Sequence, residues 1–235
     1  MRRRVLSAGL APVAGAALLV LAAVSPASAA TAVPVTFDCQ AKPPVGDPQQ
    51  LTLSSSIQAD APEVVTTGDG FEVTLAADPL TVPAQAGGYT VNNLRDLTLK
   101  VPVPEGSTYQ SATLTGGSNL GTGTPSVAQA DNVVTVTVPG PLAGGSTFQL
   151  PALHLGLTAT GPAGSTIETS LAGTGYADPG MTFTANVKVS FFNVDVPASC
   201  YANPSPTLTS TAVTDPAPTD PAPTDPGPAA PAAVS

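Results

Sequence analysis

Apolar and polar residues alternate with a period of two along most of the chain between residues 33 and 196. In the first such segment, Val35 and Phe37 fall on one face and Thr36 and Asp38 on the other. Successive side chains of a β-strand point to opposite faces, so this period is typical of strands with one buried face. The same alternation recurs at 51–57, 71–75, 97–103, 109–113, 134–138, 148–150, 153–157, 167–171, 183–191 and 194–196.

Turn-forming residues separate these segments. Pairs or triplets rich in Gly, Pro and Asp stand at 68–70, 87–88, 116–117, 139–141, 144–145, 161–162 and 178–180, and such residues favour tight reversals of the chain. Short strands at this spacing, each with one apolar face, are typical of all-β domains. We therefore predict an antiparallel, immunoglobulin-like β-sandwich of about ten strands, with a closed β-barrel as the alternative.

Both ends of the chain differ in composition from the part between them. Residues 1–29 start with three arginines after Met1, continue with an apolar stretch over about 10–24 and end in Ala27-Ser28-Ala29, the pattern of a signal peptide. Residues 203–235 are rich in proline and contain repeats of Thr-Asp-Pro-Ala-Pro. The sequence therefore predicts a signal peptide over 1–29, one β-sandwich domain over 31–202, and a disordered, removable, acidic tail over 203–235.

Cys39 and Cys200 are the two cysteines of the sequence, and they lie near the two ends of the predicted domain. A signal peptide directs a chain to an oxidising compartment, where cysteines of secreted proteins pair. We therefore expect a disulfide between them. In the chain-entropy description, a bridge that closes so long a loop contributes about 5 kcal/mol to stability.

The charge balance excludes one class of partner. The chain has 16 Asp and Glu against 7 Lys and Arg, for a net charge of −9, and an acidic protein repels phosphate backbones. We therefore expect no nucleic-acid partner. We also expect no membrane-spanning segment once the signal peptide is removed, and a location outside the cell or associated with the cell wall.

The residues that commonly carry catalysis or bind metals are scarce. His154 is the single histidine, and it alternates with Leu153 and Leu155, which places it on the outward face of its strand. No serine occupies a G-x-S-x-G elbow, and one histidine with two paired cysteines supplies too few ligands for a zinc site. Acidic residues such as Glu72 are expected at turns and on solvent-facing positions. We therefore predict no catalytic residue, no metal site and no cofactor.

A glycine-rich loop is the candidate for recognition. Residues 115–125 read TGGSNLGTGTP and lack the Gly-Lys-Ser/Thr sequence of a phosphate-binding loop. Loops that connect the strands of a rigid scaffold often carry binding residues. We therefore predict a binding site at Gly116, Gly117, Ser118 and Asn119.

Three segments together resemble a known family. They are 92–104 (NNLRDLTLKVPVP), 114–121 (LTGGSNLG) and 203–206 (NPSP), and they resemble secreted actinobacterial β-sandwich proteins of unknown function, some of which are named cyclase or dehydratase. The resemblance spans about residues 33–208. It implies a secreted β-sandwich and brings no catalytic motif onto residues of this chain.

These observations favour a secreted or cell-envelope module with a binding or structural role and an unknown envelope or extracellular partner. The first alternative is a lyase or hydrolase that acts on an apolar substrate between the sheets. The second is a carrier of a lipid or small apolar ligand. A filled core favours the module, whereas an acid-lined or ligand-sized cavity favours one of the alternatives.

Overall fold

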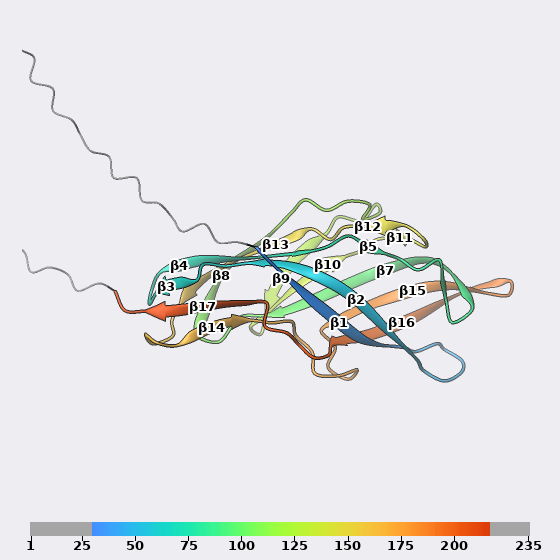
Figure 1. The fold of residues 1–235 in the computed structure, drawn as a ribbon. Helices are drawn as coiled ribbons and strands as arrows, with labels where there is room; N and C mark the ends of the chain where they lie inside the picture. Colours follow the sequence, from blue (N-terminus) through green and yellow to red (C-terminus); the bar gives the residue numbers. More distant parts are fainter. Residues whose placement is uncertain (1–29, 217–235) are drawn as a thin grey trace, which may run out of the picture.

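The computed structural model describes residues 30–216, and every helix or strand assigned among them is a β-strand (Figure 1). The signal peptide predicted over 1–29 and most of the Pro-rich repeats lie outside the described residues. Within 30–216, no helix has the length and apolar character needed to cross a membrane.

Seventeen strands follow one another in this part of the chain. The first eight are β1 (Thr31–Ala41), β2 (Gln49–Asp60), β3 (Val64–Thr66), β4 (Gly70–Ala77), β5 (Leu80–Thr81), β6 (Gln85–Ala86), β7 (Tyr89–Pro102) and β8 (Ser107–Thr115). The others are β9 (Ser126–Ala130), β10 (Val133–Val138), β11 (Leu142–Ala143), β12 (Thr147–Phe148), β13 (Ala152–Ala159), β14 (Thr166–Thr169), β15 (Met181–Val189), β16 (Phe192–Ala202) and β17 (Thr209–Thr214).

Ten of these strands form one continuous path in the order β8-β13-β4-β2-β1-β16-β15-β7-β10-β9, and β6 and β11 pair with β7 beside it. The path curls back on itself, so that its first and last strands, β8 and β9, contact each other. Two short sheets, β12–β5 and β14–β17–β3, complete the fold. The predicted antiparallel β-sandwich is therefore confirmed, and its two layers are halves of one sheet that nearly closes.

The core lies between the layers and is formed by the inward side chains of each alternation. On β13, for example, Leu153, Leu155 and Leu157 are buried while the residues between them are partly exposed. Full burial of one such side chain contributes about 1.5–3 kcal/mol. The same alternation of buried and partly exposed residues occurs on β1, β4 and β10, so several strands contribute to the contact between the layers.

The disulfide predicted between Cys39 and Cys200 is present and fully buried. Cys39 on β1 lies directly opposite Cys200 on β16, and their Cα atoms are 4.0 Å apart. The two residues are separated by 161 positions in the sequence. The bridge therefore links β1 to its neighbour in the sheet, β16, which lies far from it in the sequence.

The domain extends further than the sequence predicts. The tail expected over 203–235 includes β17, which pairs antiparallel with β14 and parallel with β3. Val213 of β17 is buried with Val65 and Ile167 in a second, smaller apolar cluster, and Leu208 is buried against the main core. The predicted boundary at 202 is therefore wrong. Val213 fixes the strand because it covers an apolar surface on β3 and β14, and Leu208, just before the strand, anchors the segment to the main core.

Candidate functional site

One end of the sandwich carries exposed apolar side chains, which we call the apolar end: Val45, Tyr89, Phe191 and Phe192. Their exposed fractions are 88%, 48%, 95% and 73%. Among residues 30–216 one other large apolar side chain, Val64 on β3, is comparably exposed. The β1–β2, β6–β7 and β15–β16 connections lie together at the right-hand end of the molecule, whereas β3 lies toward the left (Figure 1). Four of the five most exposed large apolar side chains among residues 30–216 therefore lie at the same end of the sandwich (Figure 1).

Two tight hairpins hold the aromatic residues of this end. Gly87 and Gly88, both with positive φ, form the two-residue turn between Ala86 and Tyr89, a turn type that favours glycine. The other hairpin turns at Ser190 and Phe191, because Val189 pairs with Phe192. The sequence predicts one strand over 183–191, but the strand ends at Val189, and Ser190, with a φ of 53°, and Phe191 form the turn.

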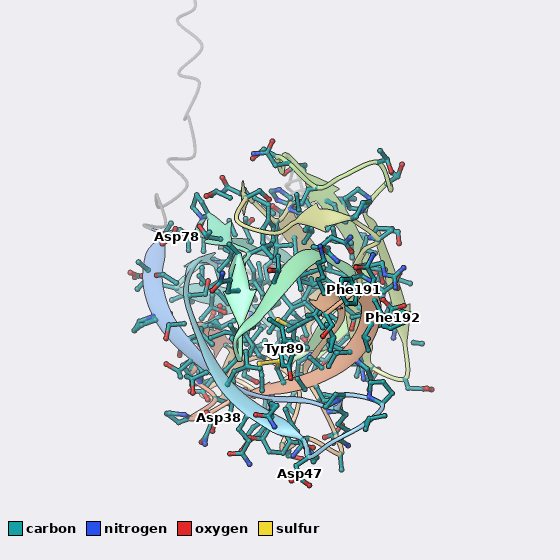
Figure 2. All side chains as sticks on the ribbon, turned by 90° about the vertical axis from the view of Figure 1, so that its right-hand side faces the viewer. Asp38, Asp47, Asp78, Tyr89, Phe191 and Phe192 are labelled. Carbon is teal, nitrogen blue, oxygen red and sulfur yellow. A yellow bond between two sulfur atoms is a disulfide. The ribbon has the colours of Figure 1, made fainter. Side chains whose placement is uncertain are left out.

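The inward face of the sheet continues into the apolar end. Val187 on β15 pairs with Val91 on β7, and both are buried. Lys188 pairs with Thr90, so Val189 and Tyr89 are the next residues toward the end of the two antiparallel strands, and Val189 also pairs with Phe192 on β16. This second row follows the core row outward, to positions where Tyr89 and Phe192 are exposed. In Figure 2, which looks onto this end, Tyr89 lies near the middle with Phe191 and Phe192 beside it.

A polar ladder covers the opposite face of the same strands. The Asn92 side-chain amide donates to Asn186 Oδ1 at 2.8 Å and to Asn193 Oδ1 at 3.1 Å. Asn186 in turn donates to Asp195 Oδ1 at 2.7 Å, and Arg95 forms an ion pair with Asp195. The hydrogen bond from Asn186 and the adjacent guanidinium hold the pKa of Asp195 below its ordinary value. The ladder therefore stiffens the strands that carry the apolar end.

The glycine-rich loop predicted to bind is packed against neighbouring strands. Ser118 exchanges two backbone hydrogen bonds of 3.0 Å with Gln149, and the Asn119 side chain donates to Thr147 O at 2.9 Å. Gly117 has a φ of +88°, and a Cβ atom there would lie 3.2 Å from Pro151 N and 3.3 Å from Gln149 O, so the backbone of the loop favours glycine at this position. Nothing in its geometry tests a binding role, and the site at Gly116, Gly117, Ser118 and Asn119 remains a prediction.

His154 lies on the outward face of β13, as predicted, and the structure adds partners that the sequence did not indicate. Its Nε2 lies 2.7 Å from Thr115 Oγ1 on β8, and its Nδ1 lies 3.1 Å from Glu72 Oε1 on β4. Thr74 Oγ1 also lies 3.2 Å from Nδ1. These residues are 39 to 82 positions from His154 in the sequence, so only the strand order β8-β13-β4 could have revealed the cluster.

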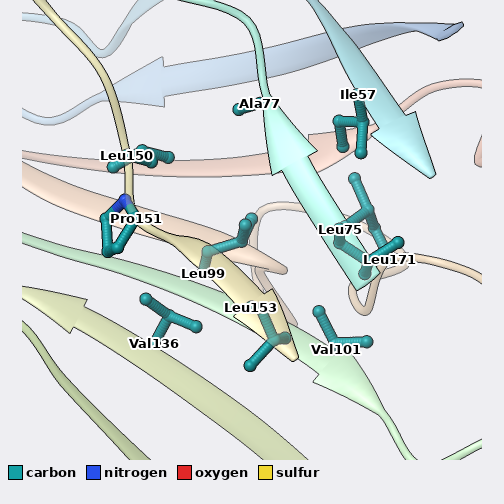
Figure 3. A pocket seen from close by; sticks show the side chains of 10 residues that line it. All are labelled: Ile57, Leu75, Ala77, Leu99, Val101, Val136, Leu150, Pro151, Leu153 and Leu171. Atoms are coloured by element: carbon teal, nitrogen blue, oxygen red, sulfur yellow. The ribbon is translucent and has the colours of Figure 1, made fainter. Parts of the chain in front are cut away.

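The interior of the sandwich is filled. Between the layers lies a cavity of about 30 Å³, lined by apolar side chains that include Leu75, Leu99, Val101 and Leu153 (Figure 3). A cavity of this size holds about one water molecule. An open hollow of about 330 Å³ lies outside the core over β3 and β4, and Glu72 borders it together with Val64 and Phe71.

Metal-binding side chains are dispersed over the described residues. In residues 30–216 no three His, Cys, Asp or Glu side chains are grouped so that they could hold a metal ion. Both cysteines are used in the disulfide.

Comparisons with known proteins support the fold alone. No protein-family model matches the sequence, and no curated protein matches it. One similar solved structure is a candidate membrane-anchored protein from Corynebacterium diphtheriae, with 17% identity and a TM-score of 0.54, over 80% of this chain and 38% of that one. The chain therefore spans well under half the length of that protein. A cohesin module from a Clostridium perfringens family 33 glycoside hydrolase aligns with 11% identity and a TM-score of 0.33, over 69% of this chain and 98% of that one.

Proposed function

We propose that this protein is a secreted or cell-envelope binding module without catalytic activity, and that it engages its partner through the apolar end. The observation that carries the proposal is the gathering of Val45, Tyr89, Phe191 and Phe192 on three connections at one end of a rigid, disulfide-linked sandwich. Soluble proteins rarely leave large apolar side chains grouped in water unless the group meets a partner.

The location of the module outside the cell is supported by two observations. A disulfide persists in oxidising compartments and is rare in the reducing cytosol, and Cys39–Cys200 is fully buried in the fold. The similar fold of a candidate membrane-anchored protein from Corynebacterium diphtheriae fits an envelope setting. The actinobacterial family suggested by the sequence remains part of this proposal.

The carrier alternative is less well supported by the packing. A pocket for a small apolar ligand usually has a volume of roughly 300 Å³ or more, whereas the cavity between the layers measures about 30 Å³. A ligand carried there would have to separate the two layers, which pack around this cavity through buried side chains such as Leu75, Val101 and Leu153.

Sedimentation with envelope fragments from the secreting cells tests the proposal. We expect the purified protein to co-sediment in a saturable manner. The double substitution Phe191→Ser with Phe192→Ser should lower the affinity for the fragments at least tenfold. Burying one Phe contributes about 1.5–3 kcal/mol, and a factor of ten in affinity corresponds to about 1.4 kcal/mol. Val64→Ser, which changes an exposed apolar residue on β3, is the matched control. Binding that never exceeds that of the double variant would contradict the proposal.

A hydrolase is the second candidate, and one observation favours it. The His154 imidazole lies between the Thr115 hydroxyl, which contacts one ring nitrogen, and the Glu72 carboxylate, which contacts the other. Many hydrolases activate a nucleophile with groups in this order. We expect His154→Gln to leave any activity found in the secreted protein unchanged. A hundredfold loss of turnover with unchanged unfolding temperature would instead assign the protein to the enzymes.

A further inference from the structure

We propose that the apolar end inserts into the surface of a lipid layer, with Phe191 and Phe192 entering most deeply and Tyr89 lying at the level of the headgroups. This inference rests on the proposed binding function and names the class of its partner. It is carried by the shape of the apolar end, its local backbone chemistry, its flanking charges and its limited area.

The shape of the apolar end is that of separate protruding tips. Val45 lies on the connection between β1 and β2, Tyr89 follows the β6–β7 turn, and Phe191 forms the tip of the β15–β16 hairpin. The connections project from the end of the sandwich that points away from residue 216, where the described chain ends (Figure 1). Protruding tips of this kind can enter a soft layer one by one, and they need no complementary pocket.

The β15–β16 turn has an aromatic residue at a central position where two-residue hairpins prefer Gly, Asn or Asp. Two-residue hairpins prefer pairs such as Asn-Gly or Gly-Gly, and the neighbouring β6–β7 hairpin follows this rule with Gly87 and Gly88. The β15–β16 turn instead uses Ser190, with a φ of 53°, and Phe191, which is 95% exposed. Departures from local rules without compensating packing are expected at functional positions, and here the departure delivers an apolar side chain to the tip.

The flanking side chains fit an interfacial position. Tyr89 combines an apolar ring with a hydroxyl group, the amphipathic character that suits the boundary between lipid and water. Lys188, one position before Val189, and Lys42, at the start of the β1–β2 connection, are both exposed near the apolar end, and one exposed acid, Asp47, lies on the same connection (Figure 2). Lysine side chains in such positions extend their charged groups toward water and headgroups while their stems lie along apolar surface.

The distribution of the apolar surface favours lipid over a second copy of the chain or another folded protein. With about 200 Å² for each aromatic ring, the exposed surface of the four side chains is on the order of 500 Å², and it is divided among three separate tips, whereas a standard protein interface buries about 800 Å² on each partner as one closely packed, complementary surface. The net charge of −9 repels anionic surfaces at long range. We therefore expect insertion to depend on apolar contact, to persist in high salt and to need no anionic lipid.

The sequence contains no tryptophan, so a single introduced tryptophan reports on its own surroundings. The test uses Phe191→Trp and, as the matched control, Val64→Trp at an exposed position on β3. Each protein is mixed with vesicles of pure phosphatidylcholine and with vesicles of equal parts phosphatidylcholine and phosphatidylglycerol. For Phe191→Trp we expect a blue shift of the emission and quenching by brominated lipid in both vesicle types, and for Val64→Trp we expect neither.

A second variant separates insertion from other modes of association. Phe192→Asp in the Phe191→Trp protein should lower the partition into phosphatidylcholine at least tenfold and leave the unfolding temperature unchanged, because Phe192 is 73% exposed. Emission that stays unshifted in both vesicle types would overturn the lipid assignment. So would a blue shift that appears without lipid and grows with protein concentration, since that result indicates self-association. If vesicles fail but envelope fragments still bind through Phe191 and Phe192, the binding module stands and its partner is not lipid.

Discussion

Removing β17 should destabilise the domain, although composition alone places this segment in a dispensable tail. We consider a chain that ends at Pro206 and a control chain that ends at Pro216. The shorter chain lacks Leu208 and Val213, which are 4% and 2% exposed in the fold. It also uncovers Ile167 on β14, the strand that pairs with β17.

The magnitude follows from the buried apolar surface. Burial of one Val or Leu side chain contributes about 1.5–3 kcal/mol, so the two residues contribute about 3–6 kcal/mol. The entropic cost of ordering the segment is opposed by the backbone hydrogen bonds of β17 with β14 and β3, so we take the lower figure, about 3 kcal/mol. For a domain of 150–250 residues each kcal/mol lowers the midpoint of unfolding by about 2–4 °C. The expected decrease is therefore roughly 6–12 °C.

Thermal unfolding followed by circular dichroism provides the assay. The chain ending at Pro216 should unfold at the temperature of the full-length protein, and the chain ending at Pro206 roughly 6–12 °C lower. Within the intact chain, Val213→Ala should reproduce part of the loss and Ser210→Ala, at an exposed position of β17, should not. If both truncated chains unfold within about 2 °C of each other, the strand does not contribute as its burial indicates.

Three further predictions concern the fold. The Cys39–Cys200 disulfide is fully buried, so dithiothreitol should not reduce it in the folded protein. Protein that has been unfolded, reduced and refolded should be less stable by up to about 5 kcal/mol in urea titrations. Two thiols that alkylate freely in the unreduced, unfolded protein would refute the bridge. Gly180→Ala should prevent normal folding because a Cβ atom there would lie 1.7 Å from Ala172 O, whereas Gly175→Ala, with open space around it, should be tolerated; equal yields of soluble protein would contradict this packing. The lowered pKa of Asp195 stabilises the fold at pH values above the ordinary pKa of a carboxyl group, and this stabilisation is lost as the pH falls through the lowered pKa. Asp195→Asn should therefore weaken the decrease of the free energy of unfolding at acidic pH. An unchanged pH dependence would show that the ladder does not contribute.

The alternation of apolar residues predicts most of the fold because its physical cause is local. A strand with one buried face must alternate, and residues 153–157 do so on β13 with no need of long-range information. The cysteine pair was predictable for a similar reason, since each of two cysteines in a domain expected to be exported has one possible partner. The strand alternation can be recognised within a single segment, and the disulfide from a single residue type.

The extent of the domain could not be predicted in the same way. The segment Thr209–Thr214 reads TSTAVT, which is weakly apolar, and its burial depends on the surface that Val65 and Ile167 present from β3 and β14. Local composition carries no information about that surface. Sequence reasoning therefore assigned the strand to the neighbouring Pro-rich repeats.

The candidate sites show the same limit. The apolar end joins residues from three connections, and the register of β15 with β7 and β16 brings Tyr89 and Phe192 into one row. One signal was present in the sequence: Phe191 and Phe192 continue an apolar run to a point where the chain must turn. The partners of His154 on β4 and β8 follow from the strand order alone, and period-two reasoning could place the imidazole on the outer face without showing what it contacts.

Hydrogen exchange with envelope fragments tests the central claim most directly, because it maps the contact surface without changing the protein. Amide exchange of the purified chain is measured by mass spectrometry with and without fragments of the secreting cells' envelope. Binding through the apolar end predicts slower exchange at 42–48, 87–92 and 188–193, and unchanged exchange at 64–66 on β3 and at 116–119. Slower exchange confined to Gly116–Asn119, or unchanged exchange at all three connections while the protein is bound, would contradict the account.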